Sequence, residues 1–194
     1  IRVNKTLEFT GAIDAGGSVA IQVPHAPQFS GDIDASDSVA IRVQAAMDLS
    51  GAISVGESIL IRGNQTLHIS GAIDAGDDVT IQVPEALDLG DASSLEMYEL
   101  VMIAHNITAS GAITSQQGID VIARQRLVTV SSSGTACTGL RCTLQLRARE
   151  LLLDGPLVGG DISVISDGNM AIGASISADA LGWDAEQGDG AGES

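Results

Sequence analysis

The chain has 194 residues and a formal net charge of −16, with 25 acidic residues against 9 basic ones. Its length fits one domain with a sizeable core. Aromatic residues make up only 2% of the sequence, although 44% is hydrophobic, which argues against aromatic sugar-binding clefts. The negative charge argues against binding to nucleic acids or anionic membranes. No apolar run reaches the roughly twenty residues of a membrane span, so we expect no membrane insertion.

A unit of about 20 residues recurs four times in a row, without insertion, from Gly11 to Gly90. Each copy begins with glycine and has isoleucine two positions later. A small polar turn follows, and then an alternating apolar run that is typical of a β-strand. The four copies are GAIDAGGSVAIQVPHAPQFS, GDIDASDSVAIRVQAAMDLS, GAISVGESILIRGNQTLHIS and GAIDAGDDVTIQVPEALDLG.

This pattern predicts an all-β fold, namely a right-handed parallel β-helix, or solenoid, with coils of about 20 residues. One unit is too small to bury its own apolar face, so successive coils must stack with equivalent strands about 4.8 Å apart. We expect the first glycine of each unit to occupy a tight corner, where the chain bends or takes a positive φ. The interior ladders would include Ile13, Ile33, Ile53 and Ile73.

The period loosens after Asp91 and then returns. The stretch LEMYELVMIA resembles a short helix, but the intact phase on both sides favours a coil with a bulge. We expect regular coils over 1–130, an inserted loop over 131–143, final coils over 144–182 and a polar, glycine-rich exit segment over 183–194. The chain begins in mid-repeat, so we expect it to be a processed piece or a segment of a longer protein.

Cysteines and asparagines favour an extracellular or cell-surface location. Cys137 and Cys142 are close enough in the sequence for a small disulfide loop, which we favour over a metal site because no other cysteine or nearby histidine is present. Three of the four asparagines begin an Asn-X-Ser/Thr triplet, the acceptor sequence for N-glycosylation. These asparagines are Asn4, Asn64 and Asn106.

Acidic residues recur at fixed positions of the repeat, which makes calcium possible. Oxygen ligands at turns suit calcium, whereas the alternative is that aspartate favours turns and keeps the chain soluble. We expect no cofactor, with calcium as a hypothesis. The residues of the two acidic columns are Asp14, Asp34 and Asp74, and Asp37, Glu57 and Asp77.

Basic residues form a column of their own, in which Arg2, Arg42 and Arg62 share a repeat position with Gln22 and Gln82. This column is either a solvated face that pairs with neighbouring acids or a lateral contact to a partner. The three histidines occupy different columns, and no nucleophile–base spacing, phosphate loop or CxxC pair is present. We therefore predict that the chain is not an enzyme.

The unit G-x-I-x-A-G-x-x-V-x-I resembles the repeats of secreted parallel β-helix proteins of the filamentous haemagglutinin type, over about residues 1–120. The ending GNMAIGASISADALGWDAEQGDGAG is similar to segments of large secreted proteins of algae and other protists, which favours a cell-surface or flagellar-hair protein. The resemblance implies a structural rod segment of a secreted filament or adhesin, whose partners are other copies or neighbouring segments of the filament. Two alternatives stay open: a carbohydrate-active β-helix enzyme, such as a polysaccharide lyase or hydrolase, and a calcium-dependent binding module.

Overall fold

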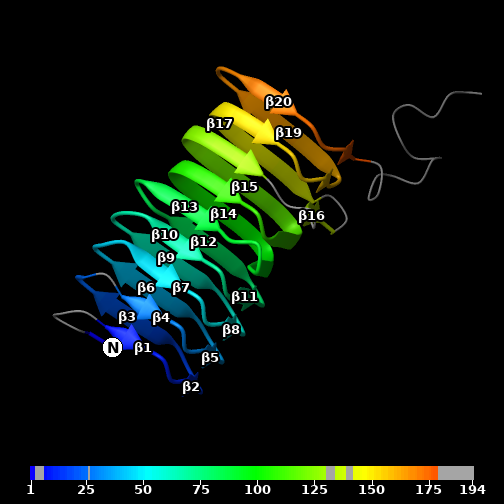
Figure 1. Cartoon of the computed structure of the whole chain (residues 1–194). Helices are drawn as coiled ribbons and strands as arrows, with labels where there is room; N and C mark the ends of the chain where they lie inside the picture. The colour runs from blue at the N-terminus through cyan, green and yellow to red at the C-terminus, as the bar shows by residue number, and fades with distance from the viewer. Residues whose placement is uncertain (3–6, 26, 130–133, 139–141, 179–194) are drawn as a thin grey trace, which may run out of the picture.

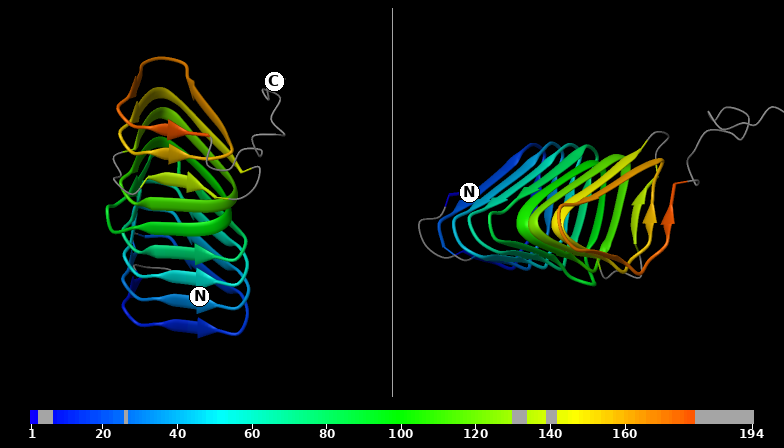
Figure 2. Two further views of the ribbon diagram at one scale, coloured as in Figure 1. Left: turned by 90° about the vertical axis from the view of Figure 1, so that its right-hand side faces the viewer. Right: turned by 90° about the horizontal axis from the view of Figure 1, so that it is seen from above.

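The structure is a computed structural model that describes residues 1–2, 7–25, 27–129, 134–138 and 142–178. Over these residues it contains no helix, and its 21 strands form one parallel sheet wound into a β-solenoid of about 8 turns (Figure 1). Coils follow one another about 20 residues apart. In the left view of Figure 2 the strands nearest the viewer run to the right as the chain climbs from its N-terminus, which is the right-handed sense. The predicted fold class is confirmed.

Each coil contributes short strands to three sides of the solenoid, which we call sides A, B and C. Side A consists of β2 (Ile13–Ala15), β5 (Ile33–Ala35), β8 (Ile53–Val55), β11 (Ala72–Ala75), the first parts of β14 (Ser94–Ala109) and β15 (Ala112–Thr129), β16 (Thr135–Cys137), β18 (Leu157–Val158) and β21 (Ile176–Ser177).

Sides B and C are built in the same way. Side B consists of β3 (Val19–Val23), β6 (Val39–Val43), β9 (Ile59–Gly63), β12 (Asp78–Gln82), the middle parts of β14 and β15, the first part of β17 (Thr143–Leu153) and β19 (Asp161–Ser166). Side C consists of β1 (Glu8–Phe9), β4 (Gln28–Phe29), β7 (Met47–Leu49), β10 (Leu67–Ile69), β13 (Ala86–Leu89), the last parts of β14, β15 and β17, and β20 (Met170–Ile172).

The alternating runs of the sequence decide which side chains point inward. Along β3 the burial pattern alternates, with Val19, Ile21 and Val23 inside and the residues between them exposed. Because the strands pair in register, equivalent residues of successive coils stack into continuous aliphatic ladders. Ile41, Ile61 and Ile81, which continue the ladder of Ile21, are each fully buried. Burial of one such side chain contributes about 1.5–3 kcal/mol.

The glycines that begin the repeats are required by close packing. A Cβ atom on Gly31, Gly51 or Gly71 would overlap the backbone carbonyl oxygen of the equivalent glycine in the preceding coil. None of these glycines has a positive φ; among the described residues Gly134 is the glycine that does, at 76°. Of the two alternatives expected for this corner, a bend or a positive φ, the chain bends at these glycines and φ is not positive.

The stretch that resembled a helix is part of strand β14. It pairs in parallel with β15, with register shifts between Met97 and Glu99 and between Ala104 and Asn106, so the predicted coil with a bulge is confirmed. At the first shift the buried Ser115 Oγ donates a hydrogen bond to the carbonyl oxygen of Tyr98 (2.6 Å). This bond satisfies a polar group that the bulge would otherwise leave without a partner.

The segment 131–143, expected as an inserted loop, is partly a strand. Thr135–Cys137 form β16, which pairs in parallel with β15 and β18 on side A. The segment therefore completes a coil, because its backbone groups find partners in the coils on both sides. Residues 131–133 and 139–141, and the exit segment over 183–194, lie outside the described residues.

The last described coil leaves apolar side chains uncovered. Ile165, Met170, Ile172 and Ile176 are 42–48% exposed, whereas the equivalent positions of inner coils are covered by the next coil or carry polar residues.

Candidate functional site

The first acidic ladder runs along the outside of side A. Asp14 pairs in register with Asp34, and Asp34 with Ser54, which is followed by Asp74 and Glu96. All of these side chains are exposed, and each coil contributes one of them. Carboxylates that are direct neighbours in the ladder repel one another in water, weakly because salt and solvent screen them.

The second acidic ladder, Asp37, Glu57 and Asp77, lies at the corner between sides A and B. Its backbone is continuous, because the Glu57 N–H donates to the Asp37 carbonyl and the Asp77 N–H donates to the Glu57 carbonyl, each at 3.1 Å. The three side chains are exposed, and the hydroxyl of Ser38 donates to Glu57 Oε2 at 3.1 Å.

Neither ladder gathers its carboxylates around one point. Within the described part of the chain, no group of three or more His, Cys, Asp or Glu side chains is arranged to hold a metal ion. The ladders instead present single carboxylates from successive coils toward solvent, with Ser54 interrupting the first ladder, and equivalent positions of adjacent coils are about 4.8 Å apart. Calcium binding by Asp14, Asp34, Asp74, Asp37, Glu57 and Asp77 stays a prediction.

The basic column runs along the outside of side B. Arg2 forms a bridge with Gln22, Gln22 pairs with Arg42, Arg42 with Arg62, and Arg62 with Gln82. In the described residues, contacts between basic and acidic side chains join His68 to Asp88 and Arg147 to Asp167, and none reaches the arginines of this column. Beside these arginines the adjacent outward column carries no charge, because its residues there are Ala20, Ala40, Leu60 and Thr80.

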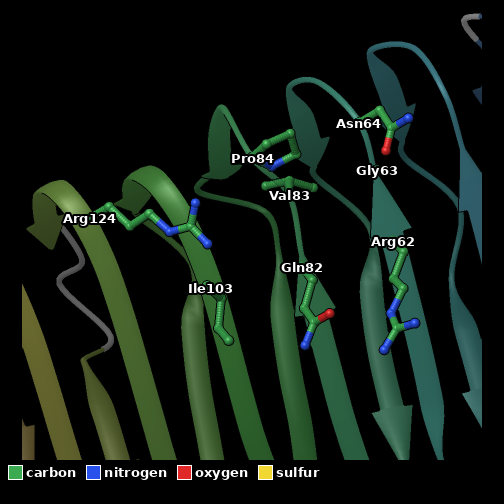
Figure 3. Close-up of a pocket in the computed structure, with 8 residues that line it drawn as sticks. All are labelled: Arg62, Gly63, Asn64, Gln82, Val83, Pro84, Ile103 and Arg124. Atoms are coloured by element: carbon green, nitrogen blue, oxygen red, sulfur yellow. The ribbon is translucent and has the colours of Figure 1, made fainter.

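A groove of about 470 Å³ opens on side B beside this column (Figure 3). Figure 3 shows Arg62 and Gln82 side by side, and Arg124 reaching toward them from a later coil. The other lining residues are Gly63, Asn64, Val83, Pro84 and Ile103, so the lining carries two cations and no carboxylate. Such a groove can hold an anion but offers no acid–base pair of the glycosidase kind.

Histidine takes part in one contact that the sequence did not suggest. His68 Nδ1 lies 3.0 Å from Asp88 Oδ2 across adjacent coils of side C. Asp48 pairs with His68 from the coil on the other side, which places the histidine between two acidic residues. The signal for this contact lies in the sequence, because Asp48, His68 and Asp88 are 20 residues apart and so occupy the same position of successive repeats. Both partners are about half exposed, so the pair contributes little to stability.

Two of the three glycosylation triplets fall on described residues. Asn64 is exposed in the turn after β9, and Asn106 is exposed on β14 at the second register shift. Asn4 lies outside the described residues.

In the structure Cys137 and Cys142 form a disulfide, with Cα atoms 5.5 Å apart and both side chains buried. Cys137 ends β16 and Cys142 directly precedes β17, so the bond closes the enlarged corner between sides A and B.

Comparison of the chain with models of protein families, with curated proteins and with solved structures found no match. Among the described residues, no helix is long and apolar enough to cross a membrane.

Proposed function

We propose that this chain is a structural rod segment of a secreted extracellular filament or adhesin, where it provides stiffness and self-assembly or attachment to a surface. The observation that carries the proposal is the continuous register of sides A, B and C from β2 to β21. Bending such a rod would stretch backbone hydrogen bonds on one side and compress packed aliphatic ladders inside, and both resist deformation.

The extracellular part of the proposal is supported by surface chemistry. The exposed positions of Asn64 and Asn106 leave room for glycans, and the Cys137–Cys142 disulfide suits an oxidising compartment. The repeat supports the finer proposal of a filamentous-haemagglutinin-like surface protein only through its small and β-branched residues. As partners we propose other copies or neighbouring segments of the same filament.

A non-catalytic role is supported by the lining of the groove beside Arg62 and Arg124, which contains no carboxylate or histidine. The outward acidic ladders take single carboxylates from several coils and do not converge on one point in the described residues, which suits a solvated surface better than a single reaction centre.

The test is electron microscopy of native material labelled with an antibody raised against the folded chain. We expect label on extracellular filaments or on the cell surface, repeated at fixed intervals. Label confined to the cell interior, or dispersed material that never associates with a larger structure, would overturn the proposal.

A further inference from the structure

Side B presents a short series of exposed side chains, one from each of four successive coils. From the N-terminal end the series consists of arginine, glutamine, arginine and arginine, at positions 2, 22, 42 and 62. None of these arginines has a carboxylate partner within the described part of the molecule. The chain carries a net charge of −16, so an unpaired row of cations on one side is a distinct local feature.

Side A presents a series in which acids stand where side B has arginines. From Asp34 onward its outward residues are aspartate, serine, aspartate and glutamate, at positions 34, 54, 74 and 96. Both series follow the same coil spacing of about 4.8 Å. The one neutral residue, Ser54, stands at the place where the basic series has its one neutral residue, Gln22.

We propose that side B of one copy docks against side A of a second copy, with the two rods side by side and parallel. A single shift of one rod along the shared axis brings the four residues of the basic series opposite the four residues of the acidic series. The resulting contacts are Arg2 with Asp34, Gln22 with Ser54, Arg42 with Asp74, and Arg62 with Glu96. The partner is thus a second copy of this chain, chosen by charge complementarity at a matched spacing.

A second observation, the exposure of Tyr98, favours the parallel orientation. Tyr98 is 43% exposed, and it is the described large exposed apolar residue that lies away from both ends of the solenoid. When two sides meet with parallel rod axes, their strands run in opposite directions. Leu60, two residues before Arg62, then meets Tyr98, two residues after Glu96. The contact would cover an apolar ring that is otherwise exposed to water.

The antiparallel orientation fits less well. It also pairs three arginines with acids, by setting Arg62 against Asp14 and Arg42 against Asp34. In that orientation the strands run in the same direction, so Leu60 faces Ala12 and Ala40 faces Asp32, and Tyr98 stays uncovered. The parallel contact joins two different sides with an axial displacement, so it is heterologous and builds open lateral assemblies.

The first experiment is sedimentation of the full chain at about 0.15 M salt, where the repulsion between two acidic rods is screened beyond about 8 Å. We expect the average mass to rise steadily with protein concentration, since each copy leaves one free docking side. A wild-type chain that sediments as a monomer across the accessible concentration range would overturn the inference.

Reversal of the charges on one side or the other then tests which residues are in contact. The double variant Arg42→Glu/Arg62→Glu should lose association, as should Asp74→Arg/Glu96→Arg, because each places like charges on both contact sides. A mixture of the two should associate again, because each contact position then has opposite charges. Thermal melting of each variant establishes that it is folded.

The matched control replaces Asp14 and Asp34 by arginine, on the same side and in the same ladder. Tested on its own, this control should keep most of the association, because it leaves the contacts of Arg42 with Asp74 and of Arg62 with Glu96 intact. Loss of association in the control together with retention in Asp74→Arg/Glu96→Arg would overturn the parallel orientation. The inference rests on the proposed function, which it deepens by naming the partner, but the two can fail separately. Monomeric chains within an extracellular filament would refute the lateral contact alone, whereas assembling chains confined to the cell interior would refute the proposed function alone.

Discussion

A methyl group on Gly51 would overlap the backbone carbonyl oxygen of Gly31 in the preceding coil. We therefore expect Gly51→Ala to lower the free energy of unfolding by about 1–3 kcal/mol, the usual cost of overpacking. Urea denaturation provides the measurement. Gly11→Ala is the matched control, because it occupies the same position of the first repeat and a Cβ there would meet no atom within 4 Å. Equal effects of the two substitutions would contradict this account of the corner.

The aliphatic ladders should dominate stability. Ile61 is fully buried between Ile41 and Ile81, so Ile61→Ala should cost about 2–5 kcal/mol through lost transfer energy and the cavity that remains. Leu60 on the same strand points outward, and Leu60→Ala should cost less than about 1 kcal/mol. Denaturation of both variants measures the difference, and a similar loss for both would mean that β9 is not held in this register.

Reduction of the Cys137–Cys142 disulfide should lower the melting temperature. A bond across a sequence separation of 5 closes a short loop, and the chain-entropy estimate for such a loop is about 2 kcal/mol. Melting with and without a thiol reductant measures the effect. The double variant Cys137→Ala/Cys142→Ala controls for unrelated effects of the reductant, which should leave its melting temperature unchanged. An unaltered melting temperature of the reduced wild type would show that the bond does not contribute.

The corner ladder of Asp37, Glu57 and Asp77 allows the calcium hypothesis to be tested. Because its carboxylates do not converge, we expect calcium and magnesium at equal concentration to raise the melting temperature equally, by screening like charges. A specific calcium site would instead give a larger rise in calcium than in magnesium, since a ligand bound only to the folded state stabilises it. That excess would disappear with a chelator and in Glu57→Gln.

Glycans should be present at Asn64 and Asn106 in material from the native source. Enzymatic release of N-glycans converts the modified asparagine to aspartate, which mass spectrometry of the two peptides detects. Asn169 is also exposed but is followed by Met170 and Ala171, so it lacks the acceptor triplet and should remain asparagine. Finding both triplets unmodified in secreted material would argue against passage through a glycosylating pathway.

The repeat period was sufficient to predict the fold because it specifies the register. Residues 20 positions apart, such as Ile41 and Ile61, are direct neighbours in the structure, and alternation places them inside. The period could not say why glycine begins each unit. A positive φ and a close approach of two backbones both select glycine, and only the arrangement of adjacent coils distinguishes them.

The other differences between the predicted and the observed structure arise where the 20-residue period of the sequence is weak. Thr135–Cys137 is a strand of three residues beside a serine- and glycine-rich stretch, too short for alternation to be visible, and it forms because β15 and β18 offer it partners. The groove beside Arg62 depends on Arg124. The position of Arg124 results from a register shift, which the spacing of the repeats does not predict. The contact between His68 and Asp88, in contrast, could have been predicted from spacing alone.

The in-register coils have a consequence for how the length of this molecule can change. Duplication of one whole unit, for example residues 51–70, would lengthen the rod by about 4.8 Å and leave every later ladder on its own side. An insertion of an odd number of residues within a strand would instead turn the buried residues outward for the remainder of that strand. The length of the rod can therefore change in steps of one coil. Duplication of the coding sequence of one unit is sufficient, and the outward residues of the other coils keep their places.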